Sequence, residues 1–397
     1  MWSFFKKLNI KQLFFLYIII HCFSCTDYGS VKNEHTNDYK NRCKIQFVGK
    51  KEIPADNETS VFDNYIQFVD TKEMPNTFAS VNEYTNSIYF YDYDSLNVKK
   101  VIRYDKEGPN GVGLMQGFCY LNPDSIFVFC ENTQMVYLTS EGAQVKWKKL
   151  MPAQSIGGPD FMPALPYLQT NVPLKYVDHK LILQGGNGET LYETATNAPI
   201  TSLYDIEEDS VLYANNYPEQ YIKYNWGDWI YKFPYYDMNE QDKLIIISFP
   251  HDHFIYVYSL LSGKNIKYYA GSQLIKKIDA FDEKKEFQPH YNSGRLQQWY
   301  YSNPTYQTVL YDKYRKLYYR IGLLPQKEKR KDFYNKKPIV LIVLDENFNY
   351  LGEGLFPDDV DLWTTESFVS REGLNMQVLT DNEDFYTFYQ FKVEIDE

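Results

Sequence analysis

A motif of strand, turn and strand recurs through most of the 397-residue chain. In each copy apolar and polar residues alternate, tyrosine, phenylalanine, valine and isoleucine are frequent, and Gly or Asn-Asp turns separate the apolar runs. Alternation with a period of two predicts β-strands, and these turn residues predict tight connections between them. The fold class that we predict is therefore all-β. The copies lie at residues 87–103, 125–148, 243–269, 338–356 and 374–393, with a less regular one between 180 and 221.

About six copies at a spacing of roughly 40–65 residues match the four-strand period of a propeller blade. We predict one β-propeller domain over residues 43–397, with six blades of four antiparallel strands. Two β-sandwich domains are the alternative, but the meanders follow one another without the long crossovers of a Greek key. Residues 43–48 should then pair with a C-terminal strand near 385–393 and close the ring. A helical period is visible only at 271–281.

The first 24 residues have the pattern of an export signal. Three lysines within residues 6–11 precede the apolar run 13–20, which is shorter than the about 20 residues of a membrane span. Ser24 and Cys25 fit a lipobox, in which the cysteine is acylated before the leader is cut, although Cys22 and Phe23 depart from the usual pattern. Cleavage by an ordinary signal peptidase within residues 24–30 is the alternative.

This leader defines the domain organisation and the cellular location that we expect. Residues 1–24 are the signal peptide, Cys25 carries the lipid, and residues 25–42 form a polar tether to the propeller. Several acyl chains hold a protein stably on a bilayer without a membrane-spanning helix. The predicted protein is an exported, membrane-anchored lipoprotein of the cell envelope, with the outer membrane as its expected site.

The charge of the chain bears on its partners. The formal net charge is −11, and removal of the leader with its lysines makes it more negative. Nucleic acid is therefore excluded as an expected partner, because phosphate binding needs clustered positive potential. The basic stretch 327–331 is interpreted as a solvated loop inserted between strands.

Cysteine is sparse for an exported protein. After Cys25 only Cys43, Cys119 and Cys130 remain, so disulfides do not form the framework of this fold. A bridge between Cys119 and Cys130 is conceivable across a hairpin. Buried free thiols are the favoured interpretation, because cysteine packs as a small apolar side chain.

One further pattern suggests a family. The turn at residues 106–111 leads into the strands 117–121 and 124–128, and it accompanies the lipobox and this chain length. The combination resembles a family of six-bladed β-propeller lipoproteins of unknown function in gut-type Gram-negative bacteria. The resemblance covers most of the mature chain and implies a fold and a leader, without a reaction.

Catalytic and cofactor motifs are missing from the sequence after residue 25. It has no G-x-S-x-G elbow, H-E-x-x-H pair, phosphate-binding P-loop or C-x-x-C pair. The glycine-rich stretch 185–188 is interpreted as a hairpin turn, and the stretch 108–117 as a connection between blades. We expect no cofactor.

Two polar clusters could suggest a metal. His251 and His253 are two residues apart, but no third ligand is near in sequence, so a turn with exposed histidines is favoured. Asp358, Asp359 and Asp361 could hold calcium, but the glycine-centred loop spacing is missing, so a solvated acidic loop is favoured. We expect no metal.

Two aromatic segments are candidates for a ligand surface. Segment 224–237 contains seven aromatic residues, and segment 295–301 adds a smaller group. Aromatic faces can stack on a sugar ring or a peptide, although a chain with 18% aromatic residues also fills its core with them. The candidate ligand-binding residues are Trp226, Trp229, Tyr231, Tyr235, Tyr236, Arg295 and Trp299.

Two functions follow from these observations. The first is a binding or scaffold lipoprotein that shows one propeller face to a glycan, a peptide or an envelope protein. The second is a propeller enzyme, a hydrolase or lyase acting on glycans, with two carboxylates about 5–10 Å apart in the axial mouth. Binding is favoured because the sequence shows no catalytic signature.

Overall fold

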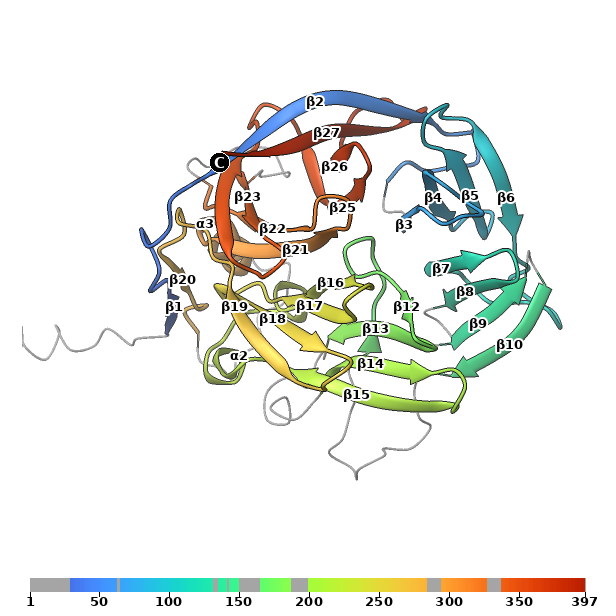
Figure 1. Cartoon of the computed structure of the whole chain (residues 1–397), viewed down its shortest axis with the longest axis horizontal. Helices are drawn as coiled ribbons and strands as arrows, with labels where there is room; N and C mark the ends of the chain where they lie inside the picture. The colour runs from blue at the N-terminus through green and yellow to red at the C-terminus, as the bar shows by residue number, and fades with distance from the viewer. Residues whose placement is uncertain are drawn as a thin grey trace, which may run out of the picture.

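The structure, a computed structural model, describes residues 29–62, 65–130, 135–140, 143–149, 165–186, 199–283, 294–326 and 337–396. Six antiparallel sheets surround a central axis, as Figure 1 shows. This confirms the predicted six-bladed β-propeller. The leader, Cys25 and the basic stretch 327–331 lie outside the described residues. The strands β22 (Leu317–Leu323) and β23 (Ile339–Leu344) flank that stretch, as expected of an insertion between strands.

The sheets follow one another in chain order, and each blade begins with its innermost strand. Blade 1 contains β3 (Ile66–Val69), β4 (Thr77–Asn82), β5 (Ser87–Asp92) and β6 (Val98–Arg103). Blade 2 contains β7 (Gly117–Asn122), β8 (Ser125–Cys130), β9 (Met135–Ser140) and β10 (Ala143–Lys149). In blade 3, β11 (Leu165–Pro166) and β12 (Lys175–Val177) both pair with β13 (Lys180–Gly186), followed by β14 (Pro199–Asp205) and β15 (Ser210–Asn216).

The second half of the ring repeats this order. Blade 4 contains β16 (Tyr235–Asn239), β17 (Leu244–Ser248), β18 (Phe254–Ser259) and β19 (Asn265–Tyr269). Blade 5 contains β21 (Thr305–Asp312), β22 (Leu317–Leu323), β23 (Ile339–Leu344) and β24 (Tyr350–Leu355). Blade 6 contains β25 (Leu362–Ser370), β26 (Gly373–Val378), β27 (Phe385–Ile395) and the N-terminal strand β2 (Cys43–Pro54).

Strand-ending aspartate and asparagine residues form the turns of several blades. The Asp92 carboxylate accepts the backbone N–H of Ser95 at 2.8 Å, and the Asn82 amide oxygen accepts that of Thr85 at 3.1 Å. Asp312 does the same for Arg315 at 3.0 Å. Such side-chain to backbone bonds favour a turn over further strand, and they account for the Asn and Asp residues between the apolar runs of the sequence.

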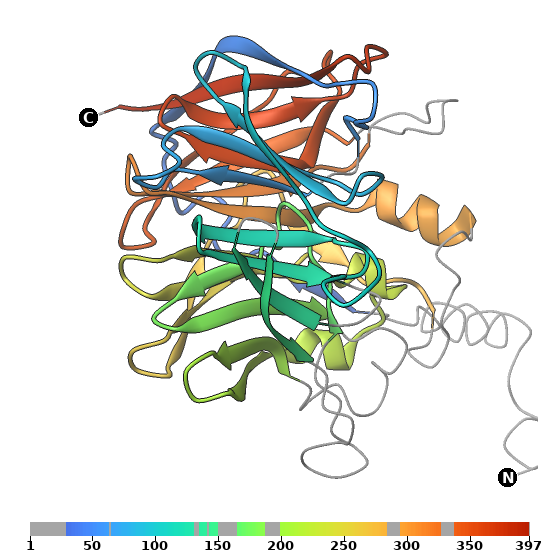
Figure 2. The same cartoon turned by 90° about the vertical axis from the view of Figure 1, so that its right-hand side faces the viewer.

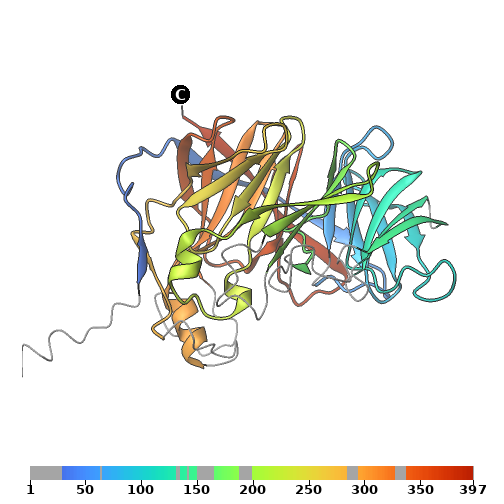
Figure 3. The ribbon, with the colours of Figure 1, turned by 90° about the horizontal axis from the view of Figure 1, so that it is seen from below.

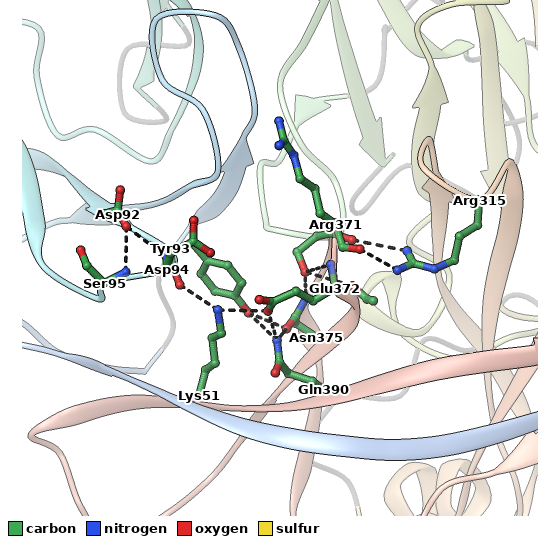
Figure 4. A network of polar contacts seen from close by, with 12 residues as sticks. Lys51, Asp92, Tyr93, Asp94, Ser95, Arg315, Arg371, Glu372, Asn375 and Gln390 are labelled. Carbon is green, nitrogen blue, oxygen red and sulfur yellow. Dashed lines mark hydrogen bonds and ion pairs between the residues drawn. The ribbon is translucent and has the colours of Figure 1, made fainter.

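Strands from the two ends of the chain close the ring, as predicted. β2 pairs with β27 along its length, from Cys43 opposite Ile395 to Pro54 opposite Phe385, and Figure 1 shows the two strands side by side. A polar network beside this seam joins blade 6 to blade 1 (Figure 4). The Lys51 ammonium donates to the Tyr93 carbonyl at 2.8 Å and pairs with Glu372 at 3.0 Å. The closing blade is thus fixed to its neighbour by side chains as well as by strand pairing.

Three short helices lie at one end of the propeller axis, seen in Figures 2 and 3. They are α2 (Glu219–Lys223), the 3-10 helix η3 (Trp229–Tyr231) and α3 (Gly294–Ser302), and they precede the inner strands β16 and β21. We call this end the helix face, and the opposite end, where the inner strands finish, the mouth face. Within the described ranges no helix is both long and apolar enough to cross a membrane.

The helix expected at 271–281 is not present. That segment contains the strand β20 (Lys277–Asp279), which pairs with β1 (Ser30–Lys32). The side-chain amide of Asn33 also donates to the backbone carbonyls of Ser272 and Ile275, at 2.9 Å each. Partners from the N-terminal segment therefore replace the local hydrogen bonds that a helix would need.

Cys43, Cys119 and Cys130 are buried thiols outside any disulfide, as favoured from the sequence. Burial raises the pKa of Cys43 to about 11 and that of Cys130 to about 12. Burial likewise raises the pKa of Cys119 to about 12. A thiol with such a pKa is almost entirely protonated near neutral pH and therefore reacts slowly.

Candidate functional site at the axial mouth

The described residues enclose a cavity of about 390 Å³ on the propeller axis. All six blades contribute to its wall, mostly through residues at or just after the ends of the inner strands, so the cavity opens toward the mouth face. We call it the axial mouth. The polar residues of its wall are Gln67, Asp70, Thr71, Thr170, Lys175, Asp237, Glu240, Gln241, Lys313 and Ser367, and the aromatic ones are Phe68, Tyr120, Tyr176, Tyr236, Tyr311, Tyr314 and Phe368.

Polar contacts across the axis form the floor of this cavity. Residues 167–174 connect β11 to β12 and make a tight turn in which Gln169 bridges Val172. The hydroxyl of Thr170 in this turn donates to Glu366 of β25, and the amide of Asn171 donates to the hydroxyl of Thr308 in β21 at 2.9 Å. Blades 3 and 6 face one another in a six-membered ring, so this turn of blade 3 reaches a strand of the opposite blade.

One wall of the axial mouth contains a lysine between two carboxylates. The ammonium of Lys175 lies 3.1 Å from Asp237 and 3.6 Å from Glu240. Burial opposes the charge of this lysine, but Asp237 and Glu240 outweigh it and raise the pKa of Lys175 above its ordinary value. Asp237 also accepts the backbone N–H of Tyr311 at 2.8 Å. These contacts join blades 3, 4 and 5.

The opposite wall contains an aspartate that several donors share. Arg371 binds Asp70 through two nitrogens, at 2.8 and 3.1 Å, and the Tyr314 hydroxyl donates to it at 2.6 Å. Burial opposes ionisation of this carboxyl, but these hydrogen bonds prevail and lower the pKa of Asp70 to about 2. Lys313 lies 3.9 Å from the same carboxylate. Blades 1, 5 and 6 meet here.

The chemistry that this arrangement permits follows from its balanced charge. Two cations of the wall, Lys175 and Lys313, lie among three carboxylates, Asp70, Asp237 and Glu240. Arg371, outside the wall, adds a third cation through its pair with Asp70. A general acid that works near neutral pH needs a carboxyl with a raised pKa, and the shift of Asp70 has the opposite sign. The wall instead offers hydrogen-bond donors, acceptors and half-buried tyrosine rings, which suit binding of a polar ligand.

The structure brings the two predicted aromatic segments together at the helix face, at the other end of the axis. The Tyr231 ring lies 6.1 Å from that of Trp299 and 4.7 Å from that of Tyr300. Trp226, Tyr236 and Trp299 are buried. All three belong to a hydrophobic core cluster, and ligand binding by them stays a prediction.

The other candidates of this set are more accessible. Trp229 is 39% exposed, and Tyr231 and Tyr235 are half-buried. Arg295 is exposed and pairs with Asp282 at 3.0 Å and with Glu283. Ligand binding by these residues stays a prediction. Tyr236 is the one candidate that also belongs to the wall of the axial mouth, where its hydroxyl donates to the Pro173 and Ile182 carbonyls.

The expectation of exposed histidines was wrong. His251 and His253 are 2% and 1% exposed. His251 packs against Trp226 and Trp299, and burial lowers its pKa well below 6.5. His253 shares a hydrogen bond of 2.8 Å with the Tyr306 hydroxyl, and burial lowers its pKa to about 4. Both rings are neutral core residues in the turn between β17 and β18.

The remaining sequence-based interpretations can be placed as well. No group of three His, Cys, Asp or Glu residues suited to a metal occurs among the described residues. Asp358, Asp359 and Asp361 are exposed between β24 and β25. Gly185 and Gly186 belong to the strand β13, so the prediction of a turn was wrong for these two residues. The rest of stretch 185–188 lies outside the described residues. Stretch 108–117 does connect blades 1 and 2.

The fold and the axial mouth define a six-bladed β-propeller with a polar axial cavity. A family model described as a domain of unknown function, DUF4221, matches residues 44–355, and the chain belongs to this family. A crystal structure of a DUF4221 member from Bacteroides vulgatus superposes with a TM-score of 0.70 at 19% identity, covering 90% of this chain and 100% of that one. A search of the curated proteins gave no match.

A second solved structure, from Bacteroides fragilis, bears a name that classes it as an exported protein. It superposes with a TM-score of 0.54 at 11% identity and covers 92% of this chain and 97% of that one. At these identities both likenesses establish the fold alone.

Proposed function

We propose that this protein is an exported, lipid-anchored binding module of the cell envelope, with its ligand site at the axial mouth. The observation that carries the proposal is the wall of that cavity, where two cations, three carboxylates and several tyrosines surround about 390 Å³. Ligand pockets commonly fall in a range of about 300–1,000 Å³. The proposed location in the cell envelope rests on the leader and Cys25. The name of the B. fragilis structure, an exported protein, is in line with export.

The chemistry of the wall favours a neutral, hydroxyl-rich ligand, and we therefore propose an envelope glycan. Each carboxylate of the wall is already paired with a cation, so the mouth has little net attraction for an ion. Carboxylates accept hydrogen bonds from sugar hydroxyls, and ammonium groups donate to them. The half-buried rings of Tyr176, Tyr311 and Tyr314 offer apolar faces to the C–H side of a sugar.

The experiment is thermal unfolding of residues 26–397 with a panel of oligosaccharides, with oligopeptides and calcium for comparison. A ligand at about 100 times its dissociation constant stabilises the folded state by about 2.7 kcal/mol. We expect an oligosaccharide to raise the unfolding midpoint and to be recovered unchanged. Cleavage of the sugar would instead support the glycan-degrading enzyme, and a midpoint that no sugar moves would contradict the proposal.

The anchor is tested separately. Full-length protein should fractionate with detergent-soluble membrane lipoproteins, and a Cys25→Ala variant should be released, because it lacks the acylated thiol. A Cys25→Ser variant provides a second substitution of the same site. Membrane association that survives both changes would contradict lipid anchoring.

A further inference from the structure

The N-terminal segment lies along the outside of the propeller from Gly29 onward. β1 pairs with β20, and Asn33 donates to two carbonyls of the segment that precedes β20. Further along, the Tyr39 ring stacks on Tyr269 with centroids 5.2 Å apart. The described part of the expected tether, residues 29–42, is therefore packed against blades 4 and 5.

The first described residue, Gly29, is fixed beside the helix face. The Gly29 carbonyl accepts a hydrogen bond from the backbone N–H of Ala280 at 3.0 Å. The backbone N–H of Phe281, which follows Ala280, donates to the carbonyl of Asn225 at 2.8 Å. Gly29 has a φ of +98°, and a Cβ there would lie 2.2 Å from a Tyr224 ring carbon. Glycine is thus required by both backbone and packing, and the position of Gly29 beside the helix face is well defined.

We propose that the protein stands on the bilayer with its helix face toward the lipid and its axial mouth pointing away. This inference rests on the lipid anchor at Cys25 proposed above. Gly29 follows Cys25 by four positions, and an extended chain over four positions spans at most about 14 Å. The helix face must therefore lie close to the headgroups into which the acyl chains insert.

The surface of the helix face suits this position. Tyr231 packs against Trp299 and Tyr300 of α3 and so fixes the short helix η3. The two preceding residues of η3 point outward, with Trp229 39% and Ile230 49% exposed. Trp is enriched where protein meets the membrane interface, because its ring is amphipathic. The bilayer would cover apolar surface that the fold leaves open.

Single labelled cysteines test this orientation. Ile230→Cys places a probe on the helix face. Leu261→Cys, at a residue 73% exposed, places a matched probe in the turn after β18. This turn lies at the mouth face, because β18 runs in the same direction as β16. Labelling is selective, because the native thiols of the propeller are buried.

Each variant is labelled with a fluorophore and bound, as acylated full-length protein, to vesicles of phosphatidylethanolamine and phosphatidylglycerol. The vesicles also contain a lipid that carries a fluorescence quencher on its headgroup. We expect quenching at position 230 to exceed that at position 261 at least twofold. Equal quenching, or stronger quenching at position 261, would overturn the orientation while leaving the anchor intact. Protein that fails to float with the vesicles would overturn the anchor and the orientation with it.

Discussion

The indole of Trp226 lies flat against the imidazole of His251, with ring centroids 4.4 Å apart and planes inclined by 9°. The indole N–H donates to the Gln220 carbonyl at 2.9 Å. The two residues are 25 positions apart and belong to the segments before β16 and after β17. Their stack thus fixes the approach to blade 4 as part of the core.

The first prediction concerns this core. Trp226→Ala should lower the free energy of unfolding by about 3–5 kcal/mol, because it leaves a large buried cavity. Trp229→Ala, a matched change three residues away on the surface, should cost about 0.5 kcal/mol. Urea denaturation of both variants measures the difference. Equal losses would contradict the assignment of Trp226 to the core.

The second prediction concerns Asp70. Asp70→Asn should destabilise the protein by about 1–3 kcal/mol at pH 7, because Arg371 and Tyr314 lose a charged acceptor. As a control, Asp359→Asn in the exposed acidic loop should stay within about 0.5 kcal/mol of the wild type. Urea denaturation measures both, and an Asp70→Asn variant as stable as the control would contradict the role given to this carboxylate.

The third prediction is the pH dependence of the same contact. The pKa of Asp70 is lowered from 3.8 to about 2 in the folded state, so the unfolded state binds the proton more readily. The stabilisation is complete above about pH 4 and is lost as the pH falls through 2. The stability difference between wild type and Asp70→Asn should therefore shrink over that window. A difference that stays constant from pH 6 down to 2 would be the contrary result.

The fourth prediction concerns the thiols. Residues 26–397 contain three cysteines, which are all buried. Native protein should react with less than one equivalent of an aromatic disulfide reagent at pH 8, and denatured protein with three, since burial both covers these thiols and raises their pKa. Rapid native reaction would show that the blades open locally.

Much of the fold could be predicted because its determinants are local in sequence. Alternating apolar residues and Asp or Asn turns, such as the one at Asp92, mark each hairpin within a few residues. The helix α3 was missed, since Leu296 and Trp299 give a single apolar spacing of three in a segment of nine residues. Its aromatic residues suggested a ligand surface instead.

The axial mouth could not be predicted because its residues meet only in the closed ring. Asp70 and Arg371 are 301 positions apart, and sequence alone does not tell which strand of a blade is innermost. The histidines illustrate the same limit. His253 looks like part of a polar turn, but Tyr306, 53 positions later, encloses it. Charged residues just after several innermost strands, such as Asp70, Glu240 and Lys313, are the signal that could have located the mouth.

The most direct test of the central claim is to locate ligand binding at the axial mouth. Glu240→Gln with Lys313→Gln removes one negative and one positive charge from its rim, at side chains 58% and 53% exposed. Glu346→Gln with Lys316→Gln removes an exposed pair, 3.4 Å apart, from the turns of blade 5 on the same face. The affinity is measured by isothermal titration calorimetry, with the oligosaccharide that most raises the unfolding midpoint. We expect the first variant to bind it at least about tenfold more weakly than the wild type, and the second variant to bind it with unchanged affinity. Unchanged affinity in both variants would contradict binding at the mouth.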